Sequence, residues 1–310
     1  FLKKYHLFFL KKNNFLLFNM NRYWLRKLLA EENSNSSNLI HHLKTVHRSN
    51  PGFTESCAKK SVNKHGRSSY QWLAEIIEPQ KHKVVLDLAC GSGPLLELCI
   101  QKFGENLTLI GVDMSDDELN VAKKRIKNKK TMFYKAYAQN LDFIPVNYID
   151  VVLCHWALPL MNPLEPVLKE IRRVLKINGI FSAIIDGDFN LLSGYRDVHE
   201  LIYSWANKEF SNYSSFELGD TRSRCPDKLL PLVKSIFKES YVSIESDVLE
   251  IRGDPLSLAL EVSGFFYATY ALSDNNRLKM LKDLEKFFID NANSQNKALF
   301  EMPINKLTVF

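Results

Sequence analysis

The stretch that most constrains this chain runs from Val84 to Asp113, with Gly91 and Gly93 near its start. Val84 to Leu88 is a short apolar run rich in β-branched residues, which is the pattern of a strand buried on both faces. The run stops at a turn in which the two glycines permit positive φ and a close approach of ligand to backbone.

A helix and a second strand follow this glycine turn. Pro94 suits a first helical turn because the N–H that it lacks would have no partner there. Apolar residues recur at helical spacing as far as Phe103, and Gly104 is a typical C-terminal stop. The second strand, Thr108 to Val112, ends at an acid, Asp113. The predicted unit is therefore strand, glycine turn, helix and strand with an acid at its tip.

Such a unit is typical of a nucleoside site, and its details narrow the kind of nucleoside. A dinucleotide site uses G-x-G-x-x-G, but Leu96 stands where the third glycine would pack helix against strand. Asp113 lies about 20 residues after the turn, where an acid accepts ribose hydroxyls. A second acid, Asp87, precedes the turn, and its negative charge would oppose a phosphate but tolerate a cation. A cationic nucleoside without phosphate describes S-adenosyl-L-methionine (SAM).

The chain resembles the class I SAM-dependent methyltransferases, in particular bacterial small-molecule methyltransferases. The matching motifs are Asp87-Leu-Ala-Cys-Gly-Ser-Gly93, Gly111-Val-Asp-Met-Ser115 and Arg173-Val-Leu-Lys-Ile-Asn-Gly179. The resemblance implies an α/β fold, a Rossmann-like three-layer sandwich with a mostly parallel seven-stranded sheet and helical cap insertions. The alternative is an ordinary Rossmann-like core or an NAD enzyme, and the incomplete glycine pattern argues against NAD.

We expect three regions along the chain. Residues 1–40 are expected to form a poorly ordered or helical N-terminal extension, with a helix over Met20 to Ala30. Residues 41–80 are expected to form a helical lid, and residues 81–310 a class I methyltransferase domain with substrate-cap insertions after residue 186. The first segment, Phe1 to Phe18, has apolar runs far too short to span a bilayer. It is either an artefact of a misplaced gene start, with Met20 as the true start, or an interfacial anchor.

The resemblance implies a set of cofactor contacts. The expected cofactor-binding residues are Arg67, Asp87, Ala89, Gly91, Gly93, Asp113, Met114, Ala138, Gln139 and His155. Arg67 and Tyr70 precede a short predicted helix, Gln71 to Ile77, and are expected to contact the cofactor carboxylate. The alternative is that they serve as a helix cap and in surface packing. Members of the family place an Asp near the adenine amino group, but Tyr137 stands at that position here. We therefore expect Gln139 and the backbone of Ala138 to contact the adenine.

Further elements are predicted from periodicity and from turn residues. Ser115-Asp-Asp-Glu118 is predicted to form a capping box. Strands are expected over Thr131 to Ala136, Ile149 to Cys154, Ile180 to Ile185, Tyr241 to Ile251 and Leu307 to Phe310. Helices are expected from 162–165 to Asn178-Gly179 and over Val198 to Phe210, Asp227 to Phe237, Leu256 to Ala271 and Arg277 to Asp290. The aromatic residues of Leu256 to Ala271 are interpreted as ordinary core in preference to pocket wall.

His155 is the candidate catalytic residue because it follows the fourth predicted strand, beside the acceptor space. Methyl transfer from a sulfonium is an in-line displacement, so the protein mainly aligns the reactants and requires no metal. A hydroxyl or amine acceptor must also lose a proton, and a histidine with a pKa near the ordinary value of about 6.5 suits that task. The alternative is that His155 only shapes its loop. His47 is expected at the surface.

Charge and cysteines restrict the partners. The net charge of +6 is mild, and the basic run from Lys123 to Lys130 is interpreted as a solvated helix end in preference to a nucleic-acid footprint. Five cysteines without metal-ligand spacing indicate free thiols in a reducing compartment. We therefore expect a cytoplasmic enzyme without a membrane span.

The predicted function is methyl transfer to an oxygen or nitrogen atom of a small molecule, with nucleic acid disfavoured and a homodimer left open. The alternatives are a methyltransferase acting on RNA or protein, and a non-catalytic SAM-binding protein.

Overall fold

The computed structural model describes residues 36–211, 213–215 and 218–310. The helix expected over Met20 to Ala30 and the segment from Phe1 to Phe18 lie outside the described residues. The first described helix, α3 (Ser36–Ser49), spans the boundary that we expected between residues 40 and 41.

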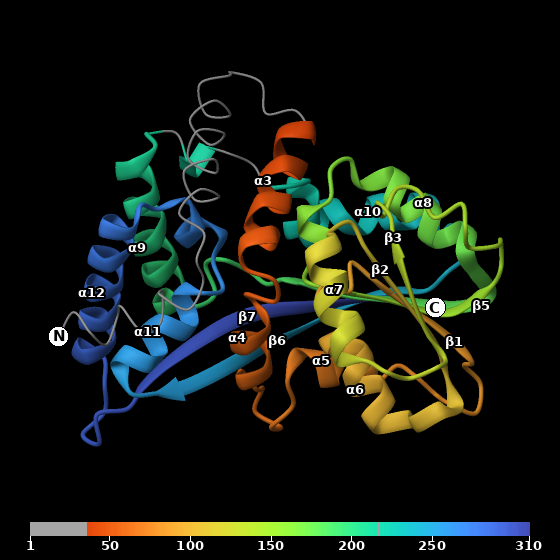
Figure 1. The fold of residues 1–310 in the computed structure, drawn as a ribbon, viewed down its shortest axis with the longest axis horizontal. Coiled ribbons are helices and arrows are strands. Elements are labelled where there is room, and N and C mark those ends of the chain that lie inside the picture. Colours follow the sequence, from red (N-terminus) through yellow and green to blue (C-terminus); the bar gives the residue numbers. More distant parts are fainter. Residues whose placement is uncertain (1–35, 212, 216–217) are drawn as a thin grey trace.

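Seven strands form one sheet in the order β3-β2-β1-β4-β5-β7-β6 (Figure 1). Six of these strands are parallel to one another, and β7 is antiparallel to both of its neighbours, β5 and β6. The strands are β1 (Val84–Leu88), β2 (Thr108–Asp113), β3 (Thr131–Lys135), β4 (Ile149–His155), β5 (Leu175–Asp186), β6 (Val242–Gly253) and β7 (Ala298–Val309). The predicted α/β class and mostly parallel seven-stranded sheet are confirmed.

Helices cover both faces of the sheet because the central strands are apolar on both sides. In β1, Val85 packs into one hydrophobic cluster with residues of α5 (Ser69–Ala74) and α6 (Pro94–Phe103). Its neighbours Leu86 and Leu88 point the other way, into a second cluster with α8 (Leu164–Val174) and α10 (Pro226–Ile236). Period-two alternation thus divides one continuous apolar run between two cores.

The remaining helices are α4 (Glu55–Lys60), α7 (Asp116–Arg125), α9 (Ser193–Glu209), α11 (Pro255–Ser263) and α12 (Asp274–Asp290), with 3₁₀ turns η1 (Gly104–Asn106), η2 (Leu158–Leu160), η3 (Tyr213–Ser215), η4 (Thr221–Arg224) and η5 (Tyr267–Ala271).

The boundary between α8 and β5 differs from the prediction. The helix ends at Val174, and β5 begins at the next residue, so Asn178 and Gly179 belong to the strand. A Cβ on Gly179 would lie 3.1 Å from the carbonyl oxygens of Ile149 and Asp150. This glycine therefore serves the close approach of β5 to an irregular stretch of β4, not a helix end.

The expected helix over Leu256 to Ala271 is wrong in its second half. Helix α11 ends at Ser263, and a separate 3₁₀ turn, η5, follows. Side chains of that turn bond back to the broken end: Thr269 Oγ1 donates to the carbonyl of Ser263 at 2.7 Å, and Tyr270 OH donates to that of Gly264 at 3.0 Å. The closing strand is also longer than expected, because β7 starts at Ala298.

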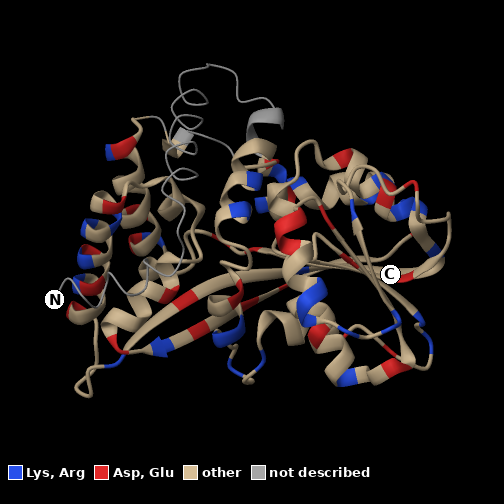
Figure 2. Ribbon diagram, viewed as in Figure 1, with Lys and Arg blue, Asp and Glu red and all other residues tan. Residues whose placement is uncertain are grey.

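Three helices that follow Asp186, α9, α11 and α12, lie together beside the sheet and are called the cap below, with the turns η4 and η5. In Figure 1, α9, α11 and α12 gather around one end of the long β6–β7 pair, whereas α6 and α7 stand toward the opposite side of the view. Charged residues of both signs lie along α12, as Figure 2 shows. No helix in the described ranges is long and apolar enough to cross a membrane.

The structure also shows the state of the cysteines and the contacts of the basic run. The five cysteines are free thiols, four buried and Cys225 partly buried. In the basic run, Arg125 is not merely solvated, because its Nη2 donates to Glu55 at 2.9 Å. Arg125 therefore ties α7 to α4.

Candidate active site

A cavity of about 300 Å³ opens at the carboxyl ends of the central strands. Strand order reverses between β1 and β4, which is where open α/β sheets bind their ligands. Eight of the ten predicted cofactor residues line it: Asp87, Ala89, Gly91, Asp113, Met114, Ala138, Gln139 and His155. Gly93 and Arg67 do not.

The glycine turn is built from left-handed backbone. Gly91 and Gly93 have φ of 52° and 81°, and Ala89 has φ of 60°, which costs a residue with a Cβ some strain. A Cβ on Gly93 would lie 3.1 Å from Ile126 Cδ1 and 3.2 Å from the Cβ of Ala122. Gly93 therefore serves the packing of the turn against α7, and Gly91 serves the cavity.

The missing third glycine has a structural explanation. A Cβ on Gly111 of β2 would lie 2.8 Å from Leu96 Cδ1. The strand, not the helix, thus supplies the glycine that lets α6 approach β2. Leu96 is fully buried at this contact. Helix α6 therefore packs closely on β2 although the third glycine of the G-x-G-x-x-G pattern is absent.

Asp113 joins the second strand to the glycine turn. Its Oδ2 accepts the Gly91 N–H at 2.9 Å, and its Oδ1 accepts the Ser115 N–H at 2.8 Å. Burial raises the pKa of this carboxyl, while nearby His47 and the two backbone N–H groups lower it. Each carboxylate oxygen has a second lone pair, so the side chain can still accept a ligand hydroxyl.

Asp87 is a buried acid without a partner. Its side chain is 1% exposed, and neither carboxylate oxygen has a hydrogen bond among the described residues. Burial and the neighbouring Asp113 raise its pKa to about 8. Buried carboxylates normally have partners, and this one lines the cavity. A cation in the cavity would supply the missing partner.

The predicted capping box at Ser115 is only half formed. Ser115 Oγ accepts the Glu118 N–H at 3.4 Å, as expected. The Glu118 carboxylate instead lies at the cavity, where Oε1 accepts the Gly52 N–H at 2.9 Å and lies 2.7 Å from His47 Nδ1. Glu118 is therefore a site residue, although its position in the sequence predicts a helix cap.

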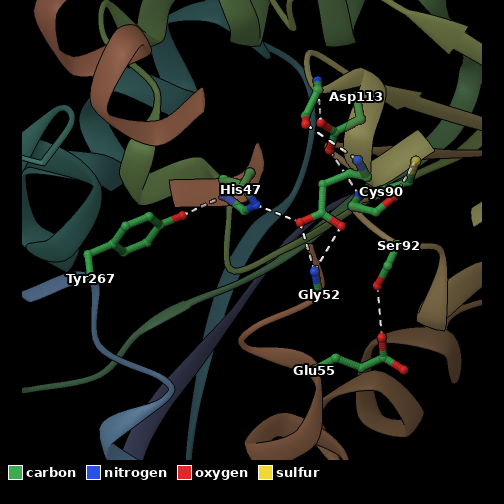
Figure 3. Close-up of polar contacts among 10 residues, drawn as sticks. His47, Gly52, Glu55, Cys90, Ser92, Asp113 and Tyr267 are labelled. Atoms are coloured by element: carbon green, nitrogen blue, oxygen red, sulfur yellow. Dashed lines mark hydrogen bonds and ion pairs between the residues drawn. The ribbon is translucent and has the colours of Figure 1, made fainter. Parts of the chain in front are cut away.

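The segment from His47 to Glu55 lies over the glycine turn (Figure 3). Besides Glu118, His47 contacts the hydroxyl of Tyr267 in η5, 2.8 Å from its Nε2. Glu55 accepts a hydrogen bond from Ser92 Oγ at 2.8 Å. The expectation that His47 is a surface residue holds only in part, because its side chain is 22% exposed and its ring joins the N-terminal segment, α7 and the cap. This role depends on three segments that meet only in the folded chain, and no sequence motif around His47 indicates it.

His155 lies at the tip of β4 and lines the cavity. Its Nε2 is 2.8 Å from Ser69 Oγ, and its ring stacks on Tyr70 with centroids 3.8 Å apart. Burial lowers its pKa to about 3, so the imidazole is neutral at physiological pH. The next residue, Trp156, has φ of 51° and packs edge-on against Phe265, with centroids 4.9 Å apart.

Arg67 and Tyr137 have other partners. Arg67 Nη1 donates to Glu75 Oε2 at 2.6 Å, outside the cavity. Tyr137 lines the cavity, and its hydroxyl accepts from Lys44 Nζ of α3 at 2.7 Å. Lys44 thereby links the N-terminal helix to the loop after β3.

Cap residues form another part of the cavity wall. Phe265, Phe266 and Tyr267 line it, so the interpretation of this aromatic group as ordinary core was incomplete. Tyr270 does not line it and packs instead on Phe53, with centroids 4.8 Å apart. Among the residues with described placement, no cluster of His, Cys, Asp and Glu could hold a metal ion.

Comparison with known proteins gives a consistent result. Residues 79–225 match the model of a family described as a methyltransferase domain. A demethylmenaquinone methyltransferase of Symbiobacterium thermophilum is 33% identical over 100 residues, which are 31% of this chain and 40% of the relative. A sterol 4-C-methyltransferase of Caenorhabditis elegans is 26% identical over 169 residues, 52% of this chain and 49% of the relative. The chain thus spans about half or less of the length of these two relatives.

The solved structures agree in fold. A candidate methyltransferase from an antibiotic biosynthesis pathway of Anabaena variabilis superposes with a TM-score of 0.56 at 14% identity. The superposition covers 80% of this chain and 98% of that one. At this level of identity the likeness establishes the architecture alone.

Proposed function

We propose that the chain transfers the methyl group of SAM to a small-molecule acceptor, because residues 79–225 match the model of a methyltransferase domain family. The observation that carries this proposal is the buried carboxylate of Asp87, which has no hydrogen-bond partner in the described part of the chain and lies beside a left-handed glycine turn. A cationic nucleoside satisfies both features, because it brings positive charge to Asp87 and needs close backbone approach at Gly91.

SAM supplies a methyl group activated on a sulfonium, and the chain's residues hold it. We propose that Asp113 accepts the ribose hydroxyls and that Asp87 faces the positively charged part of the cofactor. Met114, Ala138 and Gln139 border the end of the cavity proposed for the adenine. Alignment of donor and acceptor then supplies most of the rate, with an upper range of roughly 7–11 kcal/mol for well-oriented reactants.

Residues 41–80 are proposed to act as a lid over the cofactor. The support is the set of contacts that hold Gly52 and Glu55 against Glu118 and Ser92. These contacts hold the segment against the glycine turn, so we expect the lid to limit the access of water to the donor. Exclusion of water strengthens the electrostatic interactions inside the site.

His155 is proposed as the base if the acceptor is a hydroxyl or an amine. Its lowered pKa makes it a weak base, but a hydroxyl becomes strongly acidic as its oxygen bonds to the methyl carbon. A neutral imidazole can therefore take the proton late in the displacement. The sterol 4-C-methyltransferase relative acts, by its name, at carbon, so a carbon acceptor is the second candidate.

The test is transfer of isotope-labelled methyl from SAM to a mixture of small metabolites, followed by mass spectrometry. We expect a labelled small molecule, with no label when Gly91→Val replaces the wild type. Label only in RNA or protein would favour the macromolecular alternative. Saturable SAM binding without any labelled product would favour a non-catalytic SAM-binding protein, and absence of SAM binding would refute the proposal.

A further inference from the structure

The cavity has a second end that the cofactor residues do not reach. Strand β4 pairs with β5 so that His155 lies opposite Ile184, two residues before Asp186. Beyond this tip the lining comes from the cap: Tyr195, His199 and Tyr203 of α9, Arg224 of η4, and Phe265 and Phe266 after α11. This second end is called the cap end below.

The walls of the cap end are aromatic rings. His199 and Tyr203 stack with centroids 4.0 Å apart and planes inclined by 13°. Phe266 meets His199 nearly at right angles, with centroids 5.8 Å apart. Burial lowers the pKa of His199 to about 4, so this ring is neutral at physiological pH. Stacked and edge-on rings of this kind favour a flat aromatic ligand over a flexible chain.

One ion pair gives the cap end its polarity. Arg224 Nε donates to Asp186 Oδ2 at 3.1 Å, and its Nη2 donates to the carbonyl oxygen of Leu218 at 2.7 Å. These contacts use two of the five N–H groups of the guanidinium and one oxygen of the carboxylate. The pair therefore presents both donors and an acceptor to the cavity.

The balance of charge selects the polar group of the ligand. A carboxylate would meet Asp186, and an ammonium would meet Arg224, so each would be repelled by one member of the pair. A neutral hydroxyl can donate to the carboxylate and accept from the guanidinium at the same time. It therefore matches the pair without leaving a charge unbalanced.

We propose that the cap end is the acceptor subsite and that it takes a planar aromatic compound whose ring hydroxyl binds between Asp186 and Arg224. This inference rests on the proposed methyltransferase function and adds the acceptor class to it. The aromatic walls select the ring. The ion pair fixes the orientation of the ring relative to the other end of the cavity, the donor end, where Gly91 and Asp113 are proposed to hold SAM.

The test uses 1-naphthol as probe, with the full chain and S-adenosylhomocysteine, and measures binding of both by calorimetry. Decahydro-1-naphthol keeps the hydroxyl but loses the flat ring, and 1-methoxynaphthalene keeps the ring but cannot donate. We expect each analogue to bind at least about tenfold more weakly than 1-naphthol, because each loses one of the two recognised features.

The variant Arg224→Gln should bind 1-naphthol about tenfold or more weakly than the wild type, and its affinity for S-adenosylhomocysteine should be unchanged. Arg222→Gln is the matched control, since Arg222 lies on the same turn, pairs with Glu165 and Asp220, and does not line the cavity. Absence of 1-naphthol binding, equal binding of either analogue, or equal effects of the two arginine variants would overturn the inference. The methyltransferase proposal would still stand if S-adenosylhomocysteine binds, and it would fail separately if that ligand does not.

Discussion

The two ends of the cavity are built by different means. The donor end consists of strand tips and the turns after them, and it depends on backbone geometry at Gly91 and on acids at fixed positions. The cap end is formed by side chains from α9, η4 and the segment after α11, which are far apart along the chain. The residues of the donor end can therefore be recognised in a short stretch of sequence, whereas those of the cap end are brought together only by tertiary packing.

The largest effect should come from blocking the donor end alone. Gly91→Val adds a branched side chain at a φ of 52° where the cavity lies, so we expect loss of SAM binding by more than about a hundredfold. Gly104→Val is the matched control, because it has a φ of 61° with nothing within 4 Å of an added Cβ and lies outside the cavity. Calorimetry with SAM distinguishes obstruction from backbone strain, and equal losses in the two variants would remove Gly91 from the donor site.

The next largest effect is expected where the two ends meet. If His155 is the base, His155→Ala should lower kcat by about a hundredfold and change SAM affinity less than twofold. Because burial lowers the pKa of His155 to about 3, kcat should show no fall between pH 8 and pH 6 from protonation of this ring. An unchanged kcat in the variant would leave His155 a role in shaping the loop.

Asp87→Asn should weaken SAM binding by about tenfold, because the neutral amide cannot balance a cation. The raised pKa of about 8 means that Asp87 holds a proton in the free chain near pH 7 and releases it opposite a cation. SAM affinity should therefore rise with pH up to about 8. Calorimetry in buffers of different ionisation enthalpy should find proton release for the wild type and none for the variant. The same proton count in both would contradict this role.

A smaller effect is expected at His47, where the proposed lid contacts α7 and the cap. His47→Ala removes both its link to Glu118 and its link to Tyr267, whereas Tyr267→Phe removes only the second. We expect severalfold faster SAM dissociation in His47→Ala and a lesser change in Tyr267→Phe, measured by stopped-flow. Identical dissociation rates in all three proteins would argue against a lid over the donor.

The smallest effect is expected for a residue that the family resemblance assigned to the donor end. Arg67→Ala should change SAM affinity less than twofold, because Arg67 pairs with Glu75 outside the cavity. Gln71→Ala, which disturbs the Ser68 capping box of α5 in the same segment, controls for nonspecific loosening. A tenfold loss confined to Arg67→Ala would return this residue to the cofactor contacts.

The donor end could be predicted because its determinants lie close together in sequence. Strand β1 has the predicted bounds, and Asp87, Gly91 and Asp113 meet because consecutive parallel strands end at one edge of the sheet. The roles of Glu118 and His47 could not be predicted. Glu118 has the sequence position of a cap residue, and only the fold brings Gly52 within reach of its carboxylate.

The cap end was predicted as a region but not as a site. Arg224 and Asp186 are 38 residues apart, and neither stands in a motif that would pair them. The aromatic residues after α11 have the same periodicity whether they face a core or a cavity, so pattern alone cannot separate the two. The break at Gly264 directs Phe265 and Phe266 toward the cavity, and it depends on hydrogen bonds that form only in the folded chain.

The ladder between β6 and β7 has a consequence for how new acceptor preferences could arise. Gly253 pairs with Ala298, so residues 254–297 leave the sheet and return to it at adjacent positions. A tight turn could join the same two strands without shifting a single residue of their register. Changes of length or sequence within the segment that carries Phe265 and Phe266 can therefore alter the wall of the cap end without moving the strands, whereas Tyr267 is constrained by its contact with His47.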